Sequence, residues 1–436
     1  MTIQIPILEL IECLATAMDL ISPEVRNHHL RVAVAAHAIG QEAGLPDERL
    51  EQLVIAALLH DVGGLTSKDR LDLLRFEEQA GRHAEYGYRL LKGFAPTAKV
   101  ANIVRYHHTR WNNGNCHGAG GEPVPEESHL LYLADRIAVL VPHGFQLSQA
   151  AGIRAKIVAQ SGSHFRPDLV ACFERLAGRE AFWLDLHDAF LRPQVRAGVN
   201  RVMTLTDGEL QSLGRLFSQI IDFRSAFTAT HSSGVAAVAE ILAHLLGFSP
   251  SDTLLMSLAG HLHDIGKLVI PEDILEKEGP LTNEEYAVVR SHTYYTDRLL
   301  GTIIAFDNVR AWAAHHHERL DGSGYPFHLQ GEELSLGARI MAVADVCVAL
   351  GEDRPYRRGM GRAAAQRILD GMVANGSLDA GVVDVLNRHW QVIDRRRIAV
   401  QQAARMEYDS FYAIGPERSK LEGKQNEPIA QVAAPA

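Results

Sequence analysis

Apolar residues recur at intervals of three and four positions through most of the chain. Two such runs are Val32, Val34, Ala35, Ala36, Ile39 and Leu53, Val54, Ala57, Leu58. This spacing gathers apolar side chains on one face of an α-helix, whereas strand-like alternation between turns is scarce. The pattern therefore predicts an all-α fold.

The distribution of apolar and polar segments predicts four parts. We expect a first helical domain over residues 1–190, a helical connector over 191–223 and a second helical domain over 224–410. The apolar segment from Ile3 to Leu20 is predicted to be one amphipathic helix that packs on the first domain. Residues 411–436 are polar, small and Pro-containing, which predicts a disordered tail.

One set of metal-ligand residue types occurs twice. The two copies are His28, His60, Asp61, His83, His107, His108, Asp135 and His231, His263, Asp264, His292, His316, His317, Asp345. In both copies 32 residues separate the first His from the His-Asp pair, and 24 separate the third His from the His-His pair. A lone histidine among apolar residues is more often a core residue, but a spacing that is reproduced internally argues against that interpretation. The sequence therefore predicts a tandem repeat of a metal-binding helical domain.

Seven candidate ligands per repeat exceed what one metal ion with open positions requires. They suit two ions bridged by a carboxylate, an arrangement that can activate water for attack on phosphorus. Imidazole and carboxylate ligands favour divalent iron, manganese, nickel or zinc. We expect two divalent ions in the second repeat, and the first repeat offers ligands for two more.

Each His-Asp pair is followed by a glycine. Neighbouring residues inside a helix point about 100° apart, so a pair reaches one site most easily near a helix end. Gly63 and Gly266 stand two positions after Asp61 and Asp264. We expect these glycines to end the helices.

Composition narrows the function further. The chain is 47% hydrophobic and 22% charged, which is typical of a globular protein. A net charge of −10 argues against a DNA or RNA duplex as partner. The four cysteines, Cys13, Cys116, Cys172 and Cys347, lie far apart without CxxC spacing, which favours reduced thiols and a cytoplasmic location. No apolar run is long enough for a membrane span.

The second repeat resembles a known family. The segments HLHDIGKLVIPEDIL, SH at 291–292, HHERLDGSGYP at 316–326, ADV and DRPYR are similar to those of the HD-GYP phosphodiesterases, over roughly residues 205–400. The resemblance implies an HD-superfamily helical fold and hydrolysis of a cyclic dinucleotide, cyclic di-GMP or 3′,3′-cyclic GMP-AMP, to a linear dinucleotide. The fold expected for the whole chain is thus two tandem HD-superfamily domains joined by a helical connector.

The resemblance also implies residue roles. The seven residues of the second copy would be metal ligands, with Asp264 and Lys267 as catalytic groups. Substrate contacts would come from Lys267, Arg319, Gly324, Tyr325, Pro326, Arg354 and Arg357. Three-metal members carry a Glu four residues before the first His and many members an Asp three residues after the last ligand, where this chain has Phe227 and Val348. Both departures favour two metals.

The first repeat is similar to the wider HD superfamily. It keeps all seven ligand types, but Gly64 replaces the Lys267 equivalent, and an Asn/Gly-rich loop takes the place of Gly-Tyr-Pro. It can be a separate phosphohydrolase, a metal-binding regulator or a dimerisation scaffold. One hypothesis is that it removes the 5′-phosphate of the linear dinucleotide.

Three functions compete at this point. The leading hypothesis is a metal-dependent cyclic-dinucleotide phosphodiesterase. The alternatives are a non-catalytic HD signalling module that binds a nucleotide or a partner, and a general nucleotidase. As protein partners we expect a second copy of the chain, in a homodimer, and diguanylate-cyclase-type signalling proteins.

Overall fold

The structure is a computed structural model that describes residues 2–20, 26–65, 82–118, 121–142, 144, 147–226, 228–277, 279–353 and 358–413. Helices dominate these residues, which confirms the predicted all-α class. One small sheet of two strands accompanies them. Within the described ranges, no helix combines the length and apolar character that crossing a membrane requires.

The first repeat is a helical domain whose central helices, α2 and α3, pack against each other and against α6 and α7. Small residues such as Ala33, Ala35 and Ala57 are fully buried between these helices and let them approach closely. The helices are α1 (Ile7–Asp19), α2 (His28–Glu42), α3 (Asp47–Leu59), α5 (His83–Leu91), α6 (Ala95–Arg105), η2 (Asn112–Gly114), α7 (Glu126–Leu140), η3 (Leu147–Gln149), α8 (Ala150–Val158), α9 (Pro167–Ala177), α10 (Glu180–Asp185) and α11 (Leu191–Gly198).

The second repeat packs in the same manner, with α13 and α14 in the places of α2 and α3. Its helices are α12 (Asp207–Asp222), α13 (His231–Leu245), α14 (Pro250–Leu262), η4 (Ile265–Val269), α15 (Glu272–Leu275), α16 (Asn283–Leu300), η5 (Ile304–Phe306), α17 (Asp307–Ala314), η6 (Gly331–Glu333), α18 (Leu336–Gly351), α19 (Arg362–Ala374), α20 (Ala380–Arg388) and α21 (Trp390–Tyr412). Side-chain caps fix several of the helix starts, including those of α14 and α16. Ser249 caps α14, and Thr282 with Glu285 forms a capping box on α16.

The two strands correct two predictions. The segment predicted as one helix from Ile3 begins with strand β1 (Thr2–Pro6), and helix α1 starts only at Ile7. The predicted helical connector contains strand β2 (Val202–Thr206), which pairs antiparallel with β1, Ile3 opposite Leu205. More buried and more exposed side chains alternate along both five-residue strands. Their long-range pairing, and not the helical pattern of the residues that follow, determines the local structure.

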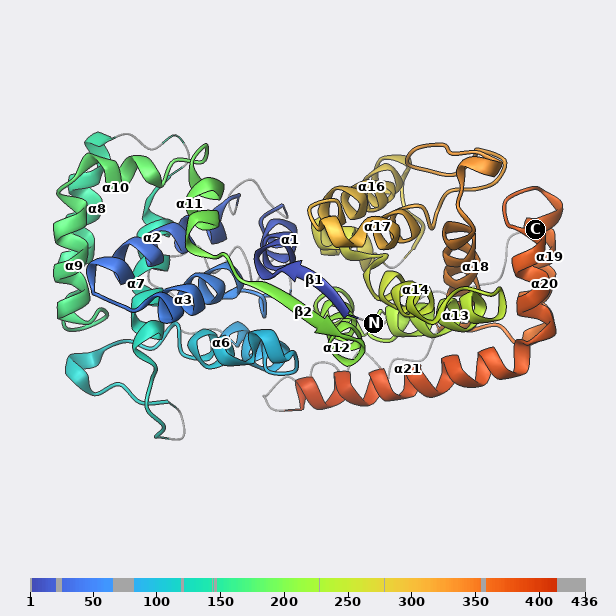
Figure 1. Ribbon diagram of the computed structural model, residues 1–436, viewed down its shortest axis with the longest axis horizontal. Helices are drawn as coiled ribbons and strands as arrows, with labels where there is room; N and C mark the ends of the chain where they lie inside the picture. Colours follow the sequence, from blue (N-terminus) through green and yellow to red (C-terminus); the bar gives the residue numbers. More distant parts are fainter. Residues whose placement is uncertain are drawn as a thin grey trace.

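Two helices join the repeats. Helix α1 contacts α3 of the first repeat and both η4 and α16 of the second, so it does not pack on the first domain alone. Helix α21 runs along the lower side of the molecule in Figure 1 and packs on α13. At its end the Phe411 ring stacks on Tyr86 of the first repeat, with 4.9 Å between ring centroids. Phe411 and Tyr412, the first two residues of the predicted tail, are therefore helical, and the residues from 414 on lie outside the described part.

Candidate metal centres

The seven candidate ligands of the second repeat converge from five helical segments. His231 begins α13, His263 and Asp264 follow the last turn of α14, His292 lies within α16, His316 and His317 follow α17, and Asp345 lies within α18. Six of the seven are buried, and His317 is partly exposed. The packing of these helices thus brings together residues that lie more than a hundred positions apart.

Asp264 lies between two groups of histidines. Its Oδ2 atom is 3.2 Å from His263 Nε2 and 3.8 Å from His231 Nε2. Its Oδ1 atom is 3.4 Å from His292 Nε2 and 3.9 Å from His316 Nε2. Because each carboxylate oxygen faces a different pair of imidazoles, Asp264 is placed to bridge two ions.

Asp61 has the same position in the first repeat. Its Oδ2 atom is 3.1 Å from His60 Nε2 and 3.9 Å from His28 Nε2, and its Oδ1 atom is 3.5 Å from His83 Nε2 and 3.7 Å from His107 Nε2. The His108 Nε2 atom lies 3.0 Å from His83 Nε2. The structure therefore brings the predicted residues of both copies into two clusters of matching geometry.

Backbone carbonyls orient several of the imidazoles. The Nδ1 atoms of His263, His292 and His316 lie 2.8, 2.6 and 2.6 Å from the carbonyl oxygen three residues earlier. His60 and His107 make the same contact in the first repeat. A carbonyl only accepts hydrogen bonds, so Nδ1 carries the proton and Nε2 is left as the metal-binding atom.

The protonation states of His292, His83 and Asp264 suit divalent metals. Burial lowers the pKa of His292 and of His83 to about 3, so these imidazoles are neutral near pH 7. Burial acts to raise the pKa of the Asp264 carboxyl, but charge on His263 and on Lys267 outweighs it and holds that pKa well below its usual range. Neutral imidazole and ionised carboxylate are the ligand forms. At His60 burial acts to lower the pKa, but the charges of Asp61 and Asp135 outweigh it and raise that pKa to about 9, so a bound ion would have to displace this proton.

Several buried atoms of the clusters lack hydrogen-bond partners within the described residues. They are His60 Nε2, Asp61 Oδ1, Asp135 Oδ1, His263 Nε2 and Asp264 Oδ1. An unsatisfied buried polar atom costs about 1–3 kcal/mol, and five such atoms all face the two cluster centres. The residues present therefore fit bound cations in both repeats.

The groups around the two clusters differ. In the second repeat Lys267 Nζ donates to Asp264 Oδ2 at 2.5 Å, and His231 Nδ1 donates to Glu352 Oε2 at 3.0 Å. At the equivalent positions the first repeat has Gly64 and Pro142. There the buried Arg136 guanidinium donates instead to Asp135 Oδ2, at 2.7 and 3.0 Å. Glu352 and Arg136 were not predicted from the sequence.

The glycines after the His-Asp pairs act differently from the prediction. Each lies in a turn or a 3-10 segment, and neither adopts the left-handed backbone of a helix-terminating glycine. A Cβ atom on Gly63 would collide with the carbonyl oxygen of His83, and one on Gly266 with that of His292. The glycines are therefore required because two backbones carrying ligands approach closely.

The Gly-Tyr-Pro loop lies against the second cluster. The Tyr325 ring is 5.1 Å from the His317 ring, and Gly324 has no room for a side chain because the backbone of Glu318 lies against it. The buried Glu318 carboxylate accepts hydrogen bonds from the backbone N–H groups of Phe327 at 2.6 Å and Leu329 at 3.1 Å. Glu318 thus fixes the loop, a role that the sequence pattern did not predict.

The predicted substrate contacts are placed only in part. Arg319 is exposed and donates to Ser323 Oγ at 3.4 Å within the loop. Arg290, which was not predicted, lies over the rings of Tyr286 and Tyr325, 5.3 and 5.9 Å from their centroids. The predictions for Arg354, Arg357 and Phe227 fall outside the described residues. Val348 is a fully buried core residue of α18.

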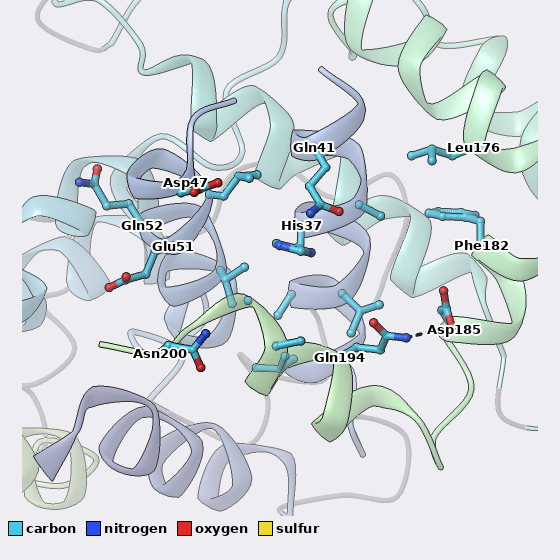
Figure 2. A pocket seen from close by; sticks show the side chains of 18 of the residues that line it. His37, Gln41, Asp47, Glu51, Gln52, Leu176, Phe182, Asp185, Gln194 and Asn200 are labelled. Atoms are coloured by element: carbon cyan, nitrogen blue, oxygen red, sulfur yellow. Dashed lines mark hydrogen bonds between the residues drawn. The ribbon is translucent and has the colours of Figure 1, made fainter. Parts of the chain in front are cut away.

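A separate cavity of about 960 Å³ lies in the first repeat, between α2, α3 and α9–α11. Figure 2 shows amide and carboxylate side chains around it, among them Gln41, Glu51 and Gln194, whose amide donates to Asp185 at 3.1 Å. No candidate metal ligand lines this cavity. It is therefore distinct from the metal centre of the same repeat.

Two clusters of histidine and aspartate on helical bundles define a class of metal-dependent phosphohydrolase. Comparison with known proteins agrees, because the HD-domain family matches residues 25–140 and, in a second form, residues 215–382. The 3′3′-cGAMP-specific phosphodiesterase 1 of Vibrio cholerae is 33% identical over 87% of this chain and 90% of its own length. The response regulator RpfG of Xanthomonas campestris, a cyclic di-GMP phosphodiesterase, is 39% identical over 40% of this chain and 46% of its own length.

A solved structure extends the likeness to the whole fold. A crystal structure of a cyclic GMP-AMP-specific phosphodiesterase of Vibrio cholerae has a TM-score of 0.61 and 25% identity, covering 90% of this chain and 98% of that chain. The chain belongs to the HD-GYP-type cyclic-dinucleotide phosphodiesterases, and the predicted family and enzyme class are confirmed. The predicted domain boundaries stay predictions.

Proposed function

We propose that the second repeat opens the ring of 3′3′-cGAMP and that its cluster is the catalytic centre. The position of Asp264 between two groups of imidazoles carries this proposal, because it would let one carboxylate hold two ions close together, as phosphodiester hydrolysis by paired metals requires. Divalent ions, when bound, supply activated water and stabilise charge on the phosphoryl oxygens. The ligands would be the seven residues of the second copy.

The relatives favour 3′3′-cGAMP over cyclic di-GMP as substrate. The long alignments that span both repeats are with proteins whose names specify 3′3′-cGAMP, whereas the relatives named for cyclic di-GMP align over less than half of this chain. Tyr286, Tyr325 and Arg290 supply two aromatic rings and a guanidinium beside His317. Aromatic rings and arginine planes stack on nucleobases, so we assign a purine of the substrate to this surface.

Lys267 stabilises negative charge during the reaction. Its side chain is about a quarter exposed, and its ammonium group is held 2.5 Å from Asp264. A fixed cation at the edge of the cluster stabilises negative charge that develops on a phosphoryl oxygen. Gly64 at the equivalent position of the first repeat cannot do this.

Two metal ions per second-repeat cluster complete the proposal. The cluster divides into two groups around the two oxygens of Asp264, and Val348 offers no oxygen ligand. Elemental analysis of the full chain bearing Asp61→Ala and His83→Ala, which weaken the first cluster, should give about two iron, manganese or nickel ions per chain. A well-occupied third ion would refute the two-metal assignment.

A substrate panel tests the main proposal. Purified full chain loaded with metal is incubated with 3′3′-cGAMP, cyclic di-GMP and 5′-mononucleotides, and the products are resolved by chromatography. We expect fastest ring opening with 3′3′-cGAMP. Preferential hydrolysis of mononucleotides would instead establish a nucleotidase, and binding without turnover a signalling module.

For the first repeat we propose removal of the 5′-phosphate from the linear product. Its cluster repeats the bridging geometry of Asp61 but lacks the lysine and the Gly-Tyr-Pro loop, so a different phosphate ester is expected there. The Asp61→Ala variant should open the ring normally and accumulate the 5′-phosphorylated dinucleotide. If wild type also stops at that product, the first repeat is not a second enzyme on this route.

A further inference from the structure

The first repeat contains a buried histidine beside the cluster that the seven-residue pattern omits. His29 follows the candidate ligand His28 and is 4% exposed. Its Nδ1 atom donates to Asp19 Oδ1 at 2.5 Å, and Asp19 is 5% exposed. A carboxylate that accepts from one ring nitrogen fixes the other nitrogen as an electron-pair donor.

The ring that carries this other nitrogen lies beside the cluster. His29 Nε2 is buried and has no hydrogen-bond partner within the described residues. The His29 ring centroid is 5.2 Å from that of His60, and ligand atoms of His29, His60 and Asp61 lie within 4.8 Å of one another. A buried acceptor without a donor is unfavourable, and a cation in the cluster would satisfy it.

The second repeat shows that this histidine is a special feature of the first. Asp222 precedes His231 by nine residues, as Asp19 precedes His28. Asp222 accepts hydrogen bonds from Ser232, at 3.0 Å from both its backbone N and its Oγ, and Ser232 occupies the position equivalent to His29. The equivalent aspartates therefore have different partners. Asp222 binds a serine in the second repeat, and Asp19 binds a histidine whose ring lies beside the cluster in the first.

We propose that His29, oriented by Asp19, is an additional metal ligand in the first repeat. This rests on the metal centre proposed above for that repeat. The ion on the Asp61 Oδ2 side then has five protein ligands, His28, His29, His60, Asp61 and Asp135, where the second repeat supplies four. A divalent ion that favours imidazole, such as zinc or iron, is held more tightly there and leaves fewer coordination positions open.

Zinc and cobalt(II) binding to the full chain tests the proposal. The Asp264→Ala, His292→Ala parent reports on the first cluster, and zinc affinity is measured by competition with a chromophoric chelator. His29→Ser should weaken zinc binding by about tenfold or more, and Asp19→Asn by about 10- to 100-fold. The visible spectrum of bound cobalt(II) should also change in His29→Ser, because its coordination number falls.

The chain offers matched controls. The Asp222–Ser232 pair shows that serine is compatible with this position of the fold, and circular dichroism checks it. In an Asp61→Ala, His83→Ala background, Asp222→Asn should leave zinc affinity of the second cluster within about threefold. Unchanged zinc affinity and an unchanged cobalt spectrum in His29→Ser would overturn the assignment. A parent that binds no zinc at all would overturn the first-repeat metal centre itself.

Discussion

The two repeats share their central chemistry and differ in what surrounds it. In each, one aspartate lies between two groups of imidazoles, at distances that agree within a few tenths of an ångström. Around that centre the second repeat places Lys267 and Glu352, whereas the first places Arg136 and His29. The repeats therefore agree in the geometry between the aspartate and the imidazoles and differ in the charged groups around it.

The positive charges show the difference most directly. Lys267 is partly exposed and contacts the bridging Asp264, so it can meet a substrate. Arg136 is buried and is bound to Asp135, so its charge is compensated within the protein. Both cations offset the carboxylates of their cluster, but only one of them can also act on a phosphate.

The largest effect should come from removing one bridging aspartate at a time. Asp264→Ala should abolish ring opening, a loss of at least about 10³-fold, because the paired-metal contribution amounts to several kcal/mol. Asp61→Ala should leave ring opening unchanged. Initial rates with 3′3′-cGAMP, alongside circular dichroism of both variants, measure this. Equal losses in the two variants would show that the repeats form one functional unit.

Substitutions at the lysine position of each repeat test the difference between the two clusters further. Lys267→Ala should lower kcat for ring opening by about 10²- to 10³-fold, the usual cost of losing one group that stabilises transition-state charge. Metal content should not fall, because Lys267 competes with the ions for Asp264. Gly64→Lys should not confer ring opening on the first repeat, which also lacks the Gly-Tyr-Pro loop. Metal loss in proportion to activity in Lys267→Ala would contradict the assigned role.

The repeated spacing made both ligand sets predictable from the amino-acid sequence, because duplication supplied an internal control. The helix-end position of each His-Asp pair was also predictable. The reason why glycine is required at positions 63 and 266 was not predictable, because it depends on how closely the helix that carries His83 or His292 approaches the glycine backbone. Glu352 escaped prediction because its counterpart is Pro142, so the repeat gave no signal.

A closer comparison of the two copies could have predicted one further feature from the sequence. Asp19 and Asp222 stand at the same distance before the first histidine, a signal that could have identified the residue orienting His29. Strand β1 was hidden because five alternating residues precede a much longer helical pattern, and its partner β2 lies about 200 residues away. Pairing at that separation is a property of the tertiary fold.

Replacing Glu352, whose carboxylate accepts a hydrogen bond from His231, should have a smaller effect on metal affinity, and this effect should again differ between the repeats. Glu352→Gln removes the charge that accepts the His231 Nδ1 proton. Metal affinity of the second cluster should fall by about 10- to 100-fold. The first cluster, with Pro142 at that position, should not change. Chelator competition on the full chain, with each cluster weakened in turn, measures both values, and an equal fall in both clusters would argue against a local role.

Arg224 provides the smallest expected effect and tests whether the repeats are independent. Its guanidinium donates to the carbonyl oxygens of Leu65 at 3.1 Å, Lys267 at 2.7 Å and Ile270 at 3.3 Å. Leu65 stands four residues after Asp61, and Lys267 three after Asp264. One side chain therefore ties together the segments that follow both His-Asp pairs.

Replacing Arg224 by Met should leave these carbonyls without that donor and cost about 1–3 kcal/mol of stability. For repeats of this size, each kcal/mol corresponds to roughly 2–4 °C in melting temperature. Arg215→Met, at an exposed arginine of α12 that contacts Ser212, is the control and should change stability by less than about 0.5 kcal/mol. Because the tie reaches both segments, ring opening and 5′-dephosphorylation should each fall, by less than about tenfold. A fall in one activity alone would show that the segments after the two His-Asp pairs move independently. The two repeats would then not be coupled in conformation through Arg224.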